Sequence, residues 1–170
     1  MTPTKIYFTK GYGVHKDKLV SFELALRAAG IERFNLVTVS SIFPAKAVIV
    51  TDKSYIDNIE AGSVVFCVMS RCESNEPDQV ISASVGLAKY QDANSYGYLS
   101  EYHESIHHLQ FENENQTPGE YAEGMAVEML QTIQDQSLAF HEMIKHNTTS
   151  TYKIKGDSWA TVIAAAILIE

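Results

Sequence analysis

The chain has 170 residues, of which 45% are hydrophobic and 20% charged, and these proportions are typical of one globular domain rather than a disordered chain. The formal net charge is −8 and there is no Lys/Arg-rich run, which argues against a nucleic-acid partner. The N-terminus lacks the apolar stretch of a signal peptide, and the longest apolar run, residues 159–169, is too short to span a bilayer. We therefore expect a single domain over residues 1–170, located in the cytoplasm, with no membrane partner.

The first elements in chain order are a strand and a helix. Residues 5–14 have the composition of a strand that is broken by glycines. Residues 17–29 predict a helix, with Asp17 as its N-cap and Gly30 just past its end. The helix is expected to turn an apolar stripe to the core, made of Leu19, Phe22, Leu26 and Ala29.

The middle of the chain predicts several strands. Residues 64–71 (VVFCVMSR) are almost continuously apolar, which is typical of a central strand. Cys67 and Cys72 are an odd number of residues apart, so they should point to opposite faces of this strand as reduced thiols. The other strands predicted here are 34–41, a half-buried 79–89, and 96–102.

A second helix and two strands complete the chain. Thr117, Pro118 and Glu120 form a helix start, and Met125, Met129 and Ile133 follow at spacings of four. Strands are predicted at 148–155 and 159–169. Because strands and helices do not alternate strictly, the fold class is α+β, with mixed or antiparallel sheets covered by helices.

Two serines, Ser40 and Ser41, stand at the end of the predicted strand 34–41, where polar side chains are unusual. One interpretation is a serine-rich turn before Pro44. The other is self-cleavage, in which Ser41 Oγ attacks the Ser40 carbonyl and converts the amide to an ester. Elimination then leaves dehydroalanine at position 41, which hydrolyses to a pyruvoyl group and ammonia. Such a reaction needs hydrogen-bond donors for the oxyanion.

Blocks of sequence along nearly the whole chain decide between these interpretations. The most specific is Ser-Ser-Ile-x-Pro at residues 40–44, which closes a longer block that begins at residue 5. The other blocks are GSVVFCVM (62–69), SNEP (74–77), GYLSE (97–101), YAE (121–123) and WATVIAAA (159–166). In this order they resemble the pyruvoyl-dependent arginine decarboxylases, and the resemblance favours self-cleavage.

The resemblance implies a product of two chains, residues 1–40 and 41–170, with a pyruvoyl cofactor at the start of the larger one. It implies decarboxylation of arginine to agmatine, a layered αββα sandwich, and a homotrimer with active sites between neighbouring subunits. A pyruvoyl enzyme that acts on another amino acid is the close alternative.

Three further residues gain a role from the resemblance. Glu101 is the last residue of the GYLSE block. A glutamate near the end of a strand is usually just a solvated surface residue, but the resemblance implies that Glu101 is the catalytic proton donor. Asn35 shares strand parity with Ser41, and it is either a capped edge residue or a substrate contact. Ser40 is also expected to contact the substrate.

Glu23 lies four residues before Arg27 on the first predicted helix, so an ordinary i,i+4 ion pair explains it. In the family an acidic residue at this position, more typically Asp, contacts the substrate guanidinium. This chain has the longer Glu, which changes the length of the pocket but keeps the carboxylate that a guanidinium requires.

A competing motif is His103-Glu104-Ser105-Ile106-His107, which reads as HExxH. On a helix, two such histidines would hold zinc and the glutamate would act as a base, so a zinc hydrolase is a separate hypothesis. The segment follows a predicted strand directly and has no sustained apolar face. His103, His107 and the adjacent His108 are therefore expected to be surface residues, and no metal is expected.

Overall fold

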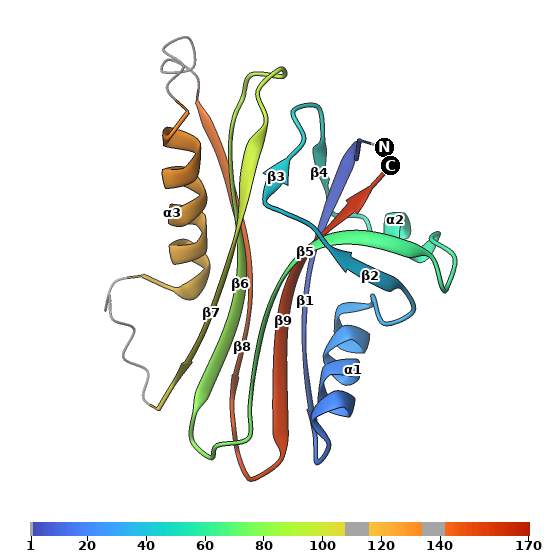
Figure 1. The fold of residues 1–170 in the computed structure, drawn as a ribbon, viewed down its shortest axis with the longest axis vertical. Helices are drawn as coiled ribbons and strands as arrows, with labels where there is room; N and C mark the ends of the chain where they lie inside the picture. Colours follow the sequence, from blue (N-terminus) through green and yellow to red (C-terminus); the bar gives the residue numbers. More distant parts are fainter. Residues whose placement is uncertain (1, 108–115, 134–141) are drawn as a thin grey trace.

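The protein is built from two face-to-face β-sheets with a helix on each outer face (Figure 1). The structure, a computed structural model, describes residues 2–107, 116–133 and 142–170. Sheet A contains, in spatial order, β2 (Asn35–Thr38), β5 (Val64–Ser74), β9 (Trp159–Ile169), β1 (Lys5–His15) and β4 (Val48–Val50). Sheet B contains β3 (Ile42–Phe43), β7 (Gly97–Ile106), β6 (Val80–Tyr90) and β8 (Met143–Lys153).

The helices are α1 (Lys18–Ala29) on sheet A, α3 (Pro118–Gln131) on sheet B, and the short α2 (Ser54–Asp57). The pairs β1–β4 and β2–β5 are parallel and the remaining strand pairs are antiparallel, so the predicted α+β class and the αββα layering are confirmed. Among the described residues, no helix is both long and apolar enough to cross a membrane.

Glycines in β1 let α1 lie directly on sheet A. A Cβ on Gly11 would stand 2.2 Å from the Ala25 carbonyl oxygen, and one on Gly13 would stand 2.3 Å from that of Ser21. The expectation that glycines break this strand is therefore wrong, because the strand runs unbroken through both. The predicted helix ends are confirmed: the Asp17 side chain accepts from two amides of the first turn, and Gly30 has φ 74°.

The predicted apolar stripe on α1 is confirmed in part. Ala29 is buried and Phe22 and Leu26 pack against the core, but Leu19 is 73% exposed, and the other buried residues are Ser21 and Ala25. The close approach over the β1 glycines admits only small side chains between helix and sheet. On α3 the helical residues buried against sheet B include Ala122, Ala126 and Leu130, whereas Met125 and Met129 are only partly buried.

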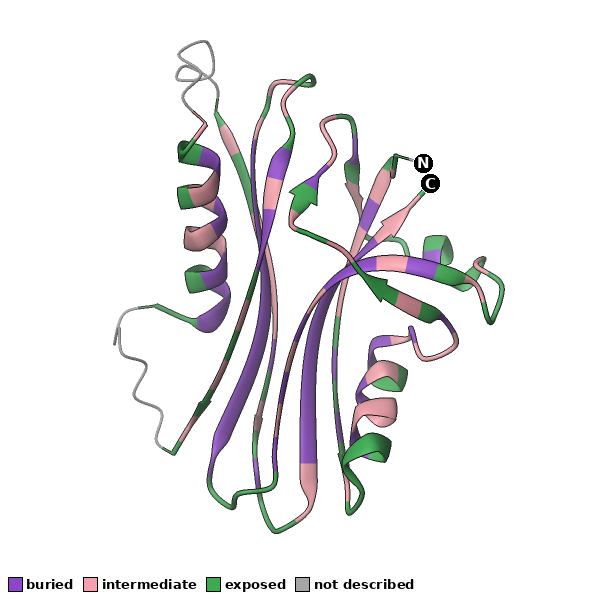
Figure 2. Ribbon diagram, in the orientation of Figure 1, coloured by how far each residue is buried: buried purple, intermediate pink, exposed green. Residues whose placement is uncertain are grey.

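Strand β6 is buried on both faces, so the prediction of a half-buried strand is also wrong (Figure 2). One face packs on sheet A and the other on α3, which explains why small and polar residues alternate with apolar ones without being solvated. Cys67 and Cys72 in β5 belong to different core clusters and are free thiols, as their odd spacing predicts.

We expect Gly86→Ala to lower the free energy of unfolding by about 1–3 kcal/mol, because overpacking at a helix–sheet contact has this effect. A Cβ on Gly86 would stand 2.3 Å from the backbone carbon of Ala122 in α3. Urea titration would measure the change. The control is Gly124→Ala in α3, where a Cβ meets nothing within 4 Å and stability should stay the same or rise. Equal stability of the two variants would contradict this account of the contact.

Candidate active site

The two serines lie where the chain leaves sheet A and enters sheet B. The predicted strand 34–41 ends early, because β2 stops at Thr38. The Val39 amide donates to the Cys67 carbonyl oxygen of β5 at 2.9 Å, and the Leu99 amide of β7 donates to the Ser41 carbonyl oxygen at 2.7 Å. The peptide bond between the serines is therefore held from both sheets.

The carbonyl that self-cleavage would attack already has a donor. The Ile42 amide donates to the Ser40 carbonyl oxygen at 3.0 Å. This bond spans two residues and makes a tight turn centred on Ser41, of the γ-turn type. An N–H at this position polarises the carbonyl and is placed to stabilise the oxyanion that forms on attack.

Glu101 stands on the same face of β7 as Leu99, two residues further on, which is about 7 Å along a strand. Its carboxylate Oε1 accepts from the Met69 amide of β5 at 3.2 Å. The side chain thus reaches from sheet B to sheet A on the side where the serines cross. Glu101 therefore lies two residues along β7 from the amide that holds the Ser41 carbonyl, although the two residues are 60 positions apart in sequence.

Glu101 is an exposed residue of β7, yet its carboxyl group is partly desolvated. Partial burial of the carboxylate raises its pKa, which the Met69 hydrogen bond and the nearby His103 offset only in part. Burial also raises the pKa of the Cys67 thiol to about 11, with a further contribution from Glu101, so this cysteine remains a thiol at neutral pH. A carboxyl group with a raised pKa is suited to general acid catalysis.

Asn35 lies at the start of β2, six residues before Ser41, which is about 20 Å if the chain is extended. Its side-chain amide donates to the Gly62 carbonyl oxygen at 2.7 Å, and its residue is exposed. In the structure the Asn35 side chain thus bonds to the loop before β5 rather than to Ser41.

Glu23 is placed on the outer surface of α1. Its carboxylate forms the expected i,i+4 pair with Arg27 at 3.0 Å, and its side chain is 44% exposed. Within one chain it lies on the helix layer outside sheet A, whereas Ser41 lies at the crossing between the sheets. Glu23 and Asn35 are thus directed to the outside of the subunit.

The HExxH segment lies on strand β7 except for His107, which directly follows the strand, so the helical zinc motif is not formed. Residues 103 and 107 are about 13 Å apart along an extended chain, which is too far for one metal ion. His107 lies 3.3 Å from the Glu76 carboxylate, at the end of the strand. Among the described residues, no three His, Cys, Asp or Glu side chains converge as metal ligands. His108 lies outside the described residues.

The backbone amides that donate hydrogen bonds at the site could not be predicted from the sequence. The amides of Ile42, Met69 and Leu99 supply the hydrogen bonds just described, and any residue type except proline could provide them. Lys89, near the end of β6, was not among the predicted functional residues. A lysine inside a strand of otherwise apolar or small residues is a signal that could have indicated it.

Two sandwiched sheets, a Ser-Ser bond held from both of them and a nearby carboxyl group of raised pKa are features that an enzyme of the pyruvoyl class requires. The sequence matches the family described as pyruvoyl-dependent arginine decarboxylase over residues 5–170. This chain belongs to that family.

Curated relatives agree with this assignment. Pyruvoyl-dependent arginine decarboxylase 1 of Methanosarcina acetivorans is 44% identical over 169 residues, which cover 99% of this chain and 97% of the relative. The Methanococcoides burtonii pyruvoyl-dependent arginine decarboxylase is 50% identical over 132 residues, 78% of this chain and 70% of the relative. A probable pyruvoyl-dependent arginine decarboxylase of Chlorobaculum tepidum is 42% identical over 182 aligned residues, 98% of this chain and 97% of the relative.

Membership of the family implies a covalent pyruvoyl cofactor, and the residues present fit this group. Position 41 is a serine, the residue from which a pyruvoyl group can form. The Ser40 carbonyl oxygen accepts a hydrogen bond from the Ile42 amide, and the Ser41 carbonyl oxygen accepts one from the Leu99 amide.

Proposed function

We propose that the chain cuts itself between Ser40 and Ser41 and then decarboxylates L-arginine to agmatine and CO2. The observation that carries this proposal is the hydrogen bond from the Ile42 amide to the Ser40 carbonyl oxygen, at the bond that must be attacked. Family membership and the position of Glu101 support the second reaction.

Self-cleavage uses groups of this chain alone. Ser41 Oγ adds to the Ser40 carbonyl carbon, and the Ile42 amide stabilises the negative charge on the carbonyl oxygen. Collapse breaks the C–N bond and leaves an ester. Loss of the Ser41 α-proton then expels the Ser40 carboxylate, which gives residues 1–40 and a dehydroalanine at position 41. One water is taken up and one ammonia is released as position 41 becomes the pyruvoyl group.

In decarboxylation the residues around position 41 orient the substrate and supply a proton. The pyruvoyl group provides an electrophilic carbonyl that accepts the electron pair released with CO2. Glu101, whose pKa is raised, is the general acid that delivers a proton to the former α-carbon. The Met69 amide fixes the direction of that carboxyl group by holding Oε1.

Glu23 and Asn35 reach the substrate in this proposal only from a neighbouring subunit. We therefore include a homotrimer, with each active site between two subunits, and a cytoplasmic location. Apolar side chains near the cleavage site support a covered surface: Val37 is 40% exposed and Ile42 is 42% exposed. Ser40, left as a new carboxyl end, borders the same site.

Glu23→Ala should raise KM for arginine on the order of 10- to 100-fold, the effect of removing a charge-assisted hydrogen bond. It should leave self-cleavage unchanged, because Glu23 lies away from the serines. Steady-state kinetics with arginine and lysine measure both the affinity and the preference for a guanidinium.

Arg27→Ala is the matched control, since it breaks the same ion pair but keeps the carboxylate. KM should then stay close to wild type. Equal effects of the two variants, or equal rates on arginine and lysine, would remove Glu23 from the substrate pocket.

A further inference from the structure

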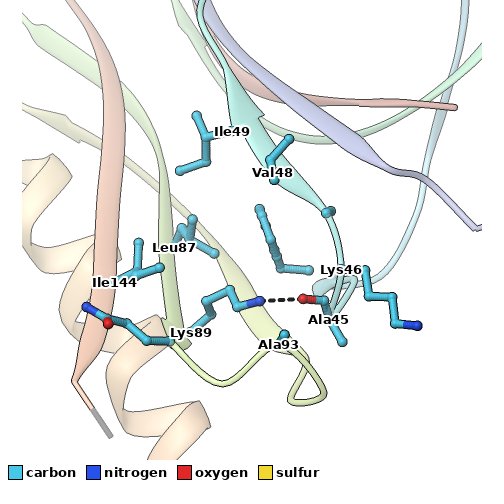
Figure 3. A pocket seen from close by; sticks show the side chains of 11 residues that line it. Ala45, Lys46, Val48, Ile49, Leu87, Lys89, Ala93 and Ile144 are labelled. Carbon is cyan, nitrogen blue, oxygen red and sulfur yellow. Dashed lines mark hydrogen bonds between the residues drawn. The ribbon is translucent and has the colours of Figure 1, made fainter.

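A lysine is buried directly behind the segment that follows the cleavage site, and neither proposed reaction uses it. Lys89 is 7% exposed and stands near the end of β6. It lines an open, mostly apolar pocket of about 470 Å³ between β4 and sheet B (Figure 3). Burial of an ammonium group is unfavourable, and here it lowers the pKa of Lys89, which the charge of Asp92 partly offsets.

The contacts of Lys89 lead to the chain just downstream of Ser41. Its Nζ donates to the Ala45 carbonyl oxygen (Figure 3). The same atom lies 5.7 Å from the centroid of the Phe43 ring. The stem of the side chain needs the space that Gly97 leaves, because a Cβ there would stand 2.4 Å from the Lys89 Cβ. The lysine thus ties the turn after β3 to the core of sheet B.

Cleavage changes what holds position 41. Before the cut, the segment is restrained on its upstream side by the Val39–Cys67 hydrogen bond and by the pairing of β2 with β5. After the cut, position 41 is a chain end and these restraints act only on the other fragment. The end is then held by its bond to Leu99, by the two-residue strand β3, and by the turn that Lys89 anchors.

We propose that Lys89 is a positioning residue that keeps the new chain end at position 41 in place after cleavage. The proposal rests on the proposed function, since it concerns the cofactor-bearing end. A displacement of about 1 Å at a reacting group can reduce turnover on the order of 100-fold. Strand β3 has only two residues, of which Phe43 is buried in the core, and the anchor at Ala45 adds a further restraint against such movement.

The test is Lys89→Met, which keeps the apolar stem and removes the donor. We expect self-cleavage within about threefold of wild type, and a kcat for arginine that falls about 10- to 100-fold with a smaller change in KM. Lys46→Met is the matched control: Lys46 lines the same pocket but is exposed and points away from Lys89 (Figure 3), so its kinetics should match wild type. Lys89→Arg, which keeps a donor, should recover most of kcat.

Hydrogen exchange at the Leu99 amide separates positioning from general stability. This amide is protected by the Ser41 carbonyl oxygen. Lys89→Met should speed its exchange in the cut protein but not in the uncut Ser41→Ala background. Turnover of Lys89→Met within threefold of wild type, or equal exchange changes in both backgrounds, would overturn the proposal. A wild-type chain that remains uncut would instead refute the proposed function itself.

Discussion

Ser41→Ala is expected to yield one uncut chain of 170 residues with no decarboxylase activity. The substitution removes the Oγ that attacks the Ser40 carbonyl, so neither the ester nor the dehydroalanine that becomes the pyruvoyl group can form. The fold should be retained, because the hydrogen bonds at this position involve the Ser41 carbonyl rather than its hydroxyl. Denaturing electrophoresis and an arginine decarboxylation assay measure both effects.

Ser40→Ala is the matched control for this experiment. Self-cleavage uses the carbonyl of residue 40 and not its hydroxyl, so this variant should still be cut into residues 1–40 and 41–170. Two fragments from purified Ser41→Ala would show that the assigned cleavage site is wrong.

Glu101→Gln is expected to be cut normally and to lose about 10²- to 10⁴-fold in turnover, the usual contribution of a positioned general acid. Glutamine has nearly the same size and keeps an oxygen that can accept from the Met69 amide, so the geometry at the crossing is preserved. Only the proton is lost. Wild-type turnover should fall as pH rises through the raised pKa of Glu101, and this limb of the pH profile should be absent in the variant.

Glu104→Gln on the same strand is the control for Glu101. Glu104 has the opposite strand parity and accepts from the Tyr102 hydroxyl at 2.9 Å, so its turnover should stay within a few-fold of wild type. The same variant tests the HExxH hypothesis, in which Glu104 would be the essential base. An uncut Glu101→Gln chain would assign Glu101 to processing instead, and near-normal turnover would remove it from the mechanism.

Local sequence signals predicted the elements well where a side chain itself makes the structural feature. Asp17 caps α1, Gly30 ends it, and Thr117 with Glu120 forms a capping box on α3. The layering and the burial of β6 on both faces depend on which element covers which sheet face. A pattern of small and polar residues along one strand does not contain that information.

The candidate site likewise has features that the sequence predicted and features that it could not predict. The Ser-Ser pair and Glu101 were found through motif blocks, and the structure brings them to one crossing between the sheets. The donor to the Ser40 carbonyl is a backbone amide, and because almost every residue type has one, the sequence could not predict it. Glu23 and Asn35 face the outside of the chain, so their contribution depends on a neighbouring subunit that a single sequence does not describe.

The mass of the purified protein under denaturing conditions tests the central claim most directly. The account predicts two fragments, residues 1–40 and residues 41–170, with a ketone rather than an amine at the start of the larger one. Their summed mass should equal that of the uncut chain plus one water and minus one ammonia. A single uncut species of 18.9 kDa, with an unmodified serine at position 41 even after prolonged incubation, would contradict it.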